Sequence, residues 1–238
     1  MRVYLSASDI PVVKRWLRQA IPNVQASIRT EAMARGFGFN TNAALLAEVK
    51  TGNVSLEVNE IKFVDFLHQR GSNPPDRTLP RAVIRTLIEP VLEANPRLTT
   101  HGFGVPNSYG WSGPKYTNEV KRSRDEYYDD WQCDQFELAL LLLQHCQKRK
   151  TLNRNVTSYG LKHTAERISR EHKIRTDLGN YVSNGVLIAA AFYEGFDVRP
   201  IEWGSLNAYL NISSKSLKHF KTKGSIYAIL ENELEIAA

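Results

Sequence analysis

The sequence predicts a mainly α-helical protein, with a small N-terminal helical unit that includes a short β-strand and a larger helical body. Apolar residues recur at three- and four-residue spacing along most of the chain, as in helices that bury one face. Capping residues, Gly and Pro separate these runs. Only VSLEV, residues 54–58, alternates like a strand. The polar linker SNPPDRTLP predicts two domains, residues 1–72 and 73–238.

The N-terminal part contains four candidate helices. The first begins near Asp9, which we expect to cap it, and ends at Pro22. The second covers residues 28–35, and the third, 43–49, is expected to be capped by Asn40. These two helices partly fit a helix-turn-helix, but the third one, AALLAEV, offers no Arg, Lys, Asn or Gln to a base edge.

A fourth helix follows the expected cap Asn59 and ends at Gly71. The helix after the linker should be kinked or split by Pro90. Residues 95–116 contain four Gly and three Pro, which predicts a long ordered loop.

The remaining chain is expected to be helical apart from a basic connector, KRKTLNRN, and a turn at Pro200. Helical spacing places Lys162 with other basic residues outside or beside an apolar stripe. Ser158 and Ser183 are candidate caps, and Gly195 is a candidate left-handed terminator. A short helix near 215–221 and a final acidic helix complete the prediction.

Charge is distributed in blocks of alternating sign around a net charge of +6. Residues 1–50 carry seven basic and three acidic groups, whereas residues 119–137 carry three basic and seven acidic ones. Residues 148–175 carry nine basic and two acidic groups. Such blocks are typical of proteins that contact nucleic acid or surfaces shaped by it, although solvated helix faces have the same composition.

The candidate contact residues follow from these blocks. Residues expected to bind a partner or nucleic acid are basic, together with one histidine among them: Lys14, Arg15, Arg18, Lys148, Arg149, Lys150, Arg154, Lys162, His163, Arg167, Arg170, Lys173, Lys215, Lys218 and Lys221. Acidic candidates for partner binding are Asp125, Glu126, Asp129, Asp130 and Asp134. Tyr159 and Phe220 are placed either to stack on bases or to join the core.

No complete catalytic or metal-binding motif is present. His and Cys residues do not occur as CxxC, HxxxH or HExxH, and neither GxSxG nor a phosphate-binding loop appears. Cys133 and Cys146 predict buried thiols in a reducing, cytoplasmic protein. No apolar run approaches the roughly 18 residues that span a membrane. We therefore expect no cofactor, metal or membrane partner.

Two segments resemble proteins of mobile genetic elements. Residues 10–50, with EAMARGFGFN and the following FVDFLHQRG, are similar to a small helical domain of plasmid and integrative-element proteins. Residues 151–218 carry TLNRNVTSYGLKHTAER, YVSNGVLIAAAFYEGF and LNAYLNISSKSL in order. This series resembles a family of largely uncharacterised accessory proteins of conjugative plasmids. The resemblance implies a setting in which proteins regulate plasmid genes, assist transfer or disarm host defences, and it supplies no catalytic residues.

Three functional hypotheses follow. The first is a non-enzymatic protein that binds a host nucleoprotein complex or its protein subunits by charge complementarity, in its most specific form an anti-CRISPR inhibitor. The second is a plasmid-encoded DNA-binding regulator or maintenance protein, with DNA or RNA as partner. The third, ranked last, is a hydrolase or nuclease that uses Asp129, Asp130 and Asp134. The oligomeric state stays open.

Overall fold

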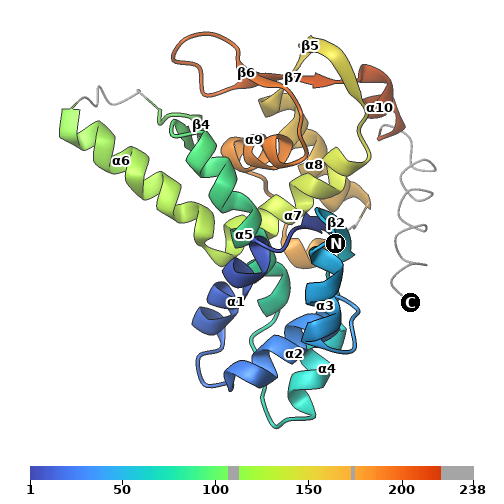
Figure 1. The fold of residues 1–238 in the computed structure, drawn as a ribbon. Helices are drawn as coiled ribbons and strands as arrows, with labels where there is room; N and C mark the ends of the chain where they lie inside the picture. The colour runs from blue at the N-terminus through green and yellow to red at the C-terminus, as the bar shows by residue number, and fades with distance from the viewer. Residues whose placement is uncertain (107–112, 173–174, 221–238) are drawn as a thin grey trace. The chain divides into compact units, whose positions relative to one another are not determined.

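The computed structural model describes residues 1–106, 113–172 and 175–220. The chain divides into two compact units, residues 1–87 and 88–238 (Figure 1). Helices dominate the described residues, and short strands accompany them in both units, so the predicted mainly α-helical fold with a small strand component is confirmed. No helix among these residues has the length and apolar character needed to cross a membrane.

The N-terminal unit consists of helices, packed mainly on one another, and a two-stranded sheet. Its elements are β1 (Arg2–Leu5), α1 (Asp9–Ala20), α2 (Ala26–Gly36), α3 (Asn42–Val49), β2 (Val54–Glu57), α4 (Glu60–His68) and the first turns of α5 (Thr78–Ala94). The predicted strand is β2, which pairs antiparallel with the unpredicted β1 so that Val3 faces Leu56. Because only Val3 and Leu5 of β1 are buried, this strand has too short an alternation to be recognised from sequence.

Local capping follows the sequence in part. Asn59 caps α4 as predicted, because its Oδ1 accepts the Lys62 N–H at 3.0 Å. At α3 the cap is Thr41 instead of Asn40, and Thr41 Oγ1 accepts the Ala44 N–H at 3.1 Å. The Asp9 carboxylate accepts the Ser6 N–H at 2.7 Å, in the turn before α1, so its expected capping role is wrong.

The start of α5 belongs to the N-terminal unit. The Glu60 carboxylate accepts the N–H groups of Thr78 and Leu79, at 2.9 and 3.0 Å. These contacts tie the first turn of α5 to α4, so the division of the chain falls within α5, later than the linker boundary expected at residue 72. The helix also continues through Pro90 without being split.

The C-terminal unit combines helices with a hairpin and a three-stranded antiparallel sheet of order β5–β7–β6. Its helices are α6 (Gly113–Asp125), η1 (Glu126–Tyr128), α7 (Asp130–Gln144), α8 (Ser158–His172), η2 (Thr176–Leu178), α9 (Asn184–Tyr193) and α10 (Ser214–His219). Its strands are β3 (Leu98–Thr99), β4 (Gly102–Phe103), β5 (Lys148–Thr157), β6 (Val198–Pro200) and β7 (Ala208–Ile212). Both α8 and α9 pack against this sheet (Figure 1).

The core of this unit lies between α7 and α9. Nearly every residue of α7 from Gln132 to Leu143 is buried, and so are the first eight residues of α9. Gly185 lets α9 touch the β3–β4 hairpin, since a Cβ there would lie 1.8 Å from the Thr99 carbonyl oxygen. The predicted central core helix is therefore present as α7. Its partner α9 packs so closely on the β3–β4 hairpin that the two backbones touch.

Strands replace several segments that the sequence assigned to loops. The expected basic connector is the strand β5, and the expected turn at Pro200 is the end of β6, which pairs with β7. Neither β5 nor β6 has an apolar alternation, because each is largely exposed and depends on β7 for pairing. Part of the predicted 95–116 loop is the β3–β4 hairpin, and residues 107–112 and the predicted final helix lie outside the described residues.

Candidate nucleic-acid interface

The four predicted basic residues of β5 share one long exposed strand. In ten residues only Asn153 is buried, so Lys148, Arg149, Lys150 and Arg154 are all exposed. Asn153 anchors the strand, because its Nδ2 donates to the Ile212 carbonyl at 3.0 Å and to Ser214 Oγ at 2.8 Å. The pairing with β7 shifts register on both sides of Asn153, which interrupts the regular alternation of the side chains.

Within the described residues, two of these cations, Lys150 and Arg154, have no hydrogen-bond, ion-pair or ring partner for their side chains. Of the others, Lys148 Nζ lies 5.3 Å from the Phe196 ring centroid, and Arg149 donates to Thr151 Oγ1 at 3.1 Å. Because β5 is an edge strand, lysines here also discourage pairing with another chain. Edge protection and phosphate binding both require exposed charge, so this surface is compatible with either role.

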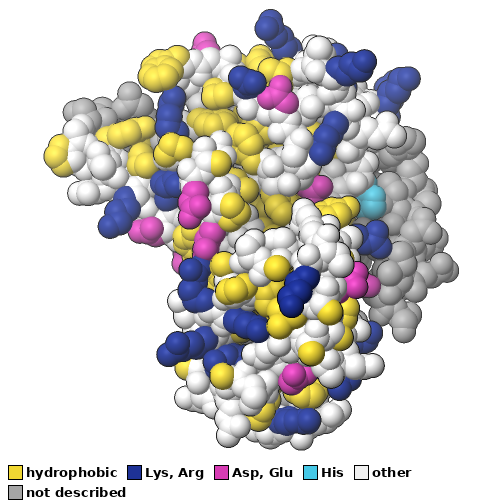
Figure 2. Space-filling model, in the orientation of Figure 1, with side chains coloured by type: hydrophobic (Ala, Val, Ile, Leu, Met, Phe, Trp, Pro, Cys, Tyr) yellow, Lys and Arg dark blue, Asp and Glu magenta, His cyan; other side chains and the backbone are white. Residues whose placement is uncertain are grey.

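The short helix α10 carries two lysines and is hydrogen-bonded to β5 and the residue before it. Its start is joined to β5 through Asn153, and Ser216 Oγ accepts the Gln147 N–H at 2.9 Å. We call the combined set the β5–α10 basic surface: Lys148, Arg149, Lys150, Arg154, Lys215 and Lys218, all exposed. Figure 2 shows Lys and Arg side chains along the edge where Figure 1 places β5, β6 and β7. The last predicted lysine here, Lys221, lies outside the described residues.

On α8 the prediction for Lys162 is wrong. Its side chain is buried, and Nζ donates to Glu166 Oε1 at 2.9 Å and to the Val182 carbonyl at 3.2 Å. Helical spacing placed it beside the apolar stripe, but Val182, in the segment before α9, supplies a carbonyl that accepts from its ammonium. Lys162 is therefore an internal cation and does not belong to the exposed basic residues.

The partner of Lys162 is a strongly hydrogen-bonded carboxylate that sequence reasoning did not single out. Glu166 also accepts the Val182 N–H at 3.2 Å and contacts His163 Nδ1 at 2.6 Å. Burial opposes ionisation, yet the hydrogen bonds from Lys162, Val182 and His163 hold the pKa of Glu166 below its ordinary value. His163 itself is exposed, so one side of this network faces solvent.

The remaining α8 candidates differ in exposure. Arg170 is exposed and lies 4.0 Å from the Glu171 carboxylate. Arg167 is half-buried and donates to the carbonyl of Phe220, at 3.5 Å. Phe220 is buried, so of its two expected roles the structure supports the core. Lys173 lies outside the described residues.

The first basic cluster belongs to the N-terminal unit. Arg15 and Arg18 are exposed on α1, and Lys14 is half-buried. The Arg15 guanidinium lies 5.3 Å from the Trp16 ring centroid, so the ring covers one side of the guanidinium. This helix presents a narrow arc, because Val13 and Leu17 bury the opposite side.

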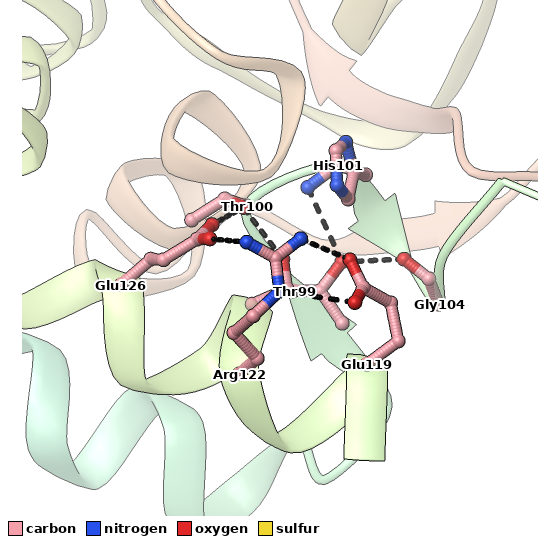
Figure 3. A network of polar contacts seen from close by, with 8 residues as sticks. Thr99, Thr100, His101, Gly104, Glu119, Arg122 and Glu126 are labelled. Carbon is pink, nitrogen blue, oxygen red and sulfur yellow. Dashed lines mark hydrogen bonds and ion pairs between the residues drawn. The ribbon is translucent and has the colours of Figure 1, made fainter. Parts of the chain in front are cut away.

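The acidic candidates do not form one exposed patch. Asp134 is buried, whereas Asp125, Asp129 and Asp130 are exposed. Glu126 accepts from Arg122 at 2.8 Å and from Thr100 at 3.2 Å, in the network that joins α6 to the β3–β4 hairpin (Figure 3).

The basic neighbours of this acidic segment have structural partners. Arg122 pairs with both Glu119 and Glu126 (Figure 3). Arg124 donates instead to the carbonyls of Leu92, Asn95 and Leu98, at 2.7 to 2.9 Å. Arg124 thus holds α6 against the segment before the β3–β4 hairpin, whereas the pairs of Arg122 lie within α6 and the turn that follows it.

The cysteines and metal-ligand types offer little chemistry. Cys133 is buried, and burial raises the pKa of the half-buried Cys146 to about 12, which suppresses the thiolate. Within residues 1–106, 113–172 and 175–220, no three His, Cys, Asp or Glu side chains are grouped to hold a metal ion. The exposed basic surface is therefore the strongest candidate site.

Sequence reasoning missed two aromatic residues of the C-terminal unit, Trp131 and Tyr181. Both are exposed and their rings stack on each other, although they are far apart in the sequence. Tyr159, for which the sequence left stacking and core roles open, is also exposed. Solvent-facing aromatic side chains have no periodic signature, so only their positions in space bring them together.

Comparison with known proteins identifies no relative of this chain. No protein-family model matches it, and neither a curated protein nor a solved structure gives a significant match. The resemblance to plasmid accessory proteins therefore stays a sequence-based prediction.

Proposed function

We propose that this chain is a non-catalytic binding protein that contacts the nucleic acid of a host nucleoprotein complex through the β5–α10 basic surface. The observation that carries the proposal is the strand β5, which exposes four cations in ten residues and buries only Asn153. Each Lys or Arg that neutralises a phosphate releases condensed counterions, so six clustered cations can support salt-sensitive binding.

The acidic route to a protein partner has weaker support. Glu126 is already engaged by Arg122 and Thr100, and Asp134 is buried. A partner would find only Asp125, Asp129 and Asp130 exposed on this segment. Inhibition of a CRISPR complex in a mobile-element setting is the most specific form of the proposal, and it would act here by occupying or competing for the nucleic acid.

Sequence-specific DNA regulation through α3 is not favoured. Its exposed residues include Ala43, Ala44, Ala47 and Glu48, which give a base edge no amide or cationic donor. Glu48 would also face the phosphates with like charge. A regulator would have to read DNA with another element.

The test is fluorescence anisotropy with labelled RNA, single-stranded DNA and duplex DNA over a series of salt concentrations. We expect Lys150→Glu/Arg154→Glu to weaken binding by about tenfold or more and to flatten the salt dependence. The matched control is Arg15→Glu/Arg18→Glu, which makes the same change in net charge on α1. Equal losses in both variants would mean that only net charge matters, and that result would overturn the assignment to β5.

A second measurement separates nucleic acid from protein recognition. The intact chain is used to capture partners from a host lysate with and without nuclease. We expect the captured complex to be lost after nuclease treatment and after the β5 substitutions. Full retention after nuclease would contradict the proposal and favour docking on a protein subunit.

A further inference from the structure

Three exposed aromatic side chains gather where α7 begins, where α8 begins and just before α9. Trp131, Tyr159 and Tyr181 are 53%, 52% and 50% exposed. The Trp131 and Tyr181 rings are stacked, with centroids 5.8 Å apart and planes within 8°. We call these three residues the aromatic cluster. Single exposed aromatic side chains are common on protein surfaces, whereas a group of half-exposed rings at the junction of three elements is a candidate binding site.

The internal cation Lys162 joins the cluster together. Its Nζ lies 4.7 Å from the Tyr181 ring centroid and 5.5 Å from that of Tyr159. Because Glu166 and the Val182 carbonyl hold this ammonium in place, its cation–π contacts with Tyr159 and Tyr181 have a fixed geometry. Tyr159 also packs edge-on against His163, at 4.6 Å between centroids.

The segment that carries Tyr181 is fixed on both sides. Ser169 Oγ on α8 donates to the Gly179 carbonyl at 2.8 Å and lies 3.0 Å from Asn180 Oδ1. The Ser183 N–H donates to Gln135 Oε1 on α7 at 2.7 Å. The backbone on both sides of Tyr181 is therefore held in place before any ligand arrives, which lowers the entropic cost of stacking on its ring.

The charge around the cluster selects its ligand. Strand β5 ends at Thr157 and α8 starts at Ser158, so the basic strand leads directly to Tyr159. Arg170 lies two turns along α8 from His163, both exposed. Lys162 is paired with Glu166, and Asp129 and Asp130 are exposed next to Trp131, so the cations that could hold a polyanion with flat bases are those of β5 and α8, on the side of Tyr159.

We infer that the aromatic cluster is a stacking platform for unpaired bases, so that the nucleic acid bound by this protein is single-stranded at that point. This inference rests on the proposed function, because the β5–α10 basic surface supplies the backbone contacts. Bases in a duplex are already stacked on each other and cannot reach the rings, whereas each unpaired base has an accessible face. The platform thus selects strand state with little selection of sequence.

The decisive comparison uses the unmodified protein and oligonucleotides of equal length, either with bases or fully abasic. Both carry the same phosphates, so binding through β5 alone would treat them alike. We expect the abasic strand to bind at least about fivefold more weakly, and the duplex to be weaker than the single strand. Parallel RNA and DNA arms distinguish the two sources of single strands.

The substitution series assigns the effect to the rings. Tyr159→Ala/Tyr181→Ala should lower affinity for the single strand by about fivefold or more, and should remove the difference from the abasic strand. Tyr159→Phe/Tyr181→Phe keeps both rings and should bind like the unmodified chain. Trp203→Ala is the matched control, because Trp203 is 89% exposed, over Arg97, outside the cluster.

The outcomes distinguish failure of the stacking platform from failure of nucleic-acid binding by the β5–α10 basic surface. Equal binding of base-containing and abasic strands, or no effect of the alanine variant, would overturn the stacking platform and leave β5 binding intact. Failure of every strand to bind would overturn both. If the alanine variant does not fold, the abasic comparison with the unmodified protein still decides.

Discussion

Glu60 in the N-terminal unit is half-buried and Glu166 in the C-terminal unit is buried, yet their pKa values move in opposite directions. Burial raises the pKa of Glu60 to about 7, although the N–H groups of Thr78 and Leu79 favour the carboxylate. The pKa of Glu166 lies below its ordinary value in spite of burial. The difference lies in the donors, since Glu166 contacts the Lys162 ammonium and Glu60 contacts peptide groups.

At Glu60, backbone donors from Arg77, Thr78 and Leu79 together with the Arg77 charge do not offset desolvation, whereas at Glu166 a hydrogen-bonded ammonium and further donors do. This difference also explains why Lys162 is internal. An unpaired ammonium in that position would be as costly as the carboxylate it stabilises, so the two charges depend on each other. The contributions of these two carboxylates to stability should therefore respond to pH in opposite senses.

The largest effect is expected from removing the cation. Lys162→Met leaves Glu166 buried without its ion pair, which should lower the free energy of unfolding by about 3–5 kcal/mol. Urea unfolding followed by circular dichroism measures the loss. Lys162→Met/Glu166→Leu removes both charges and should recover much of it, and Lys218→Met, at an exposed lysine, is the control. A loss no larger than that of the control would refute the buried-pair account.

Next in size is the pH response of Glu60. Since its pKa is raised to about 7 in the folded chain, the folded state holds a proton that the unfolded state has released. The free energy of unfolding should therefore fall as pH rises from about 4.5 to above 7, by up to about 3 kcal/mol.

Glu60→Gln should remove this decline, whereas Glu57→Gln, at an exposed residue of β2, should retain it. Urea titrations at several pH values measure both. For Glu166 the sign reverses, because a lowered pKa stabilises the folded state above the ordinary pKa and that contribution disappears as pH falls below it. Parallel pH profiles in Glu60→Gln and the unmodified chain would contradict the assignment.

A smaller effect should come from His163, which shares Glu166 with Lys162. His163→Ala removes the 2.6 Å contact at an exposed side chain, and we expect a loss of about 0.5–1.5 kcal/mol. The same unfolding assay measures it. A loss as large as that of Lys162→Met would show that the histidine holds the carboxylate ionised as much as the lysine does.

The smallest effect is expected at Arg122, the exposed centre of the network in Figure 3. Its pairs with Glu119 and Glu126 are partly solvated, so Arg122→Ala should cost no more than about 1 kcal/mol. Adding salt should reduce even this cost. A salt-insensitive loss of several kcal/mol would mean that the α6–hairpin contact depends on this pair as the α8 contact depends on Lys162.

Much of the helical fold is predictable from local pattern. Helix α1 follows from its apolar spacing, α4 from the Asn59 cap, and α9 from its continuous apolar run. Strands β5 and β6 were not predicted, because each forms only by pairing with β7, which is a separate segment of the chain. In the candidate site, the basic residues of β5 were predicted as contact residues, but the strand that carries them was not predicted.

The sequence by itself determined where charge and apolar residues concentrate, because helix periodicity, caps and composition are local properties. Only the tertiary structure decided that Lys162 turns inward and that Trp131 joins Tyr181. The physical reason is that burying a charge or stacking two rings depends on groups distant in the chain, here the Val182 carbonyl and the segment before α9. Such contacts leave no period in the sequence, since each residue meets its partner only after the chain has folded.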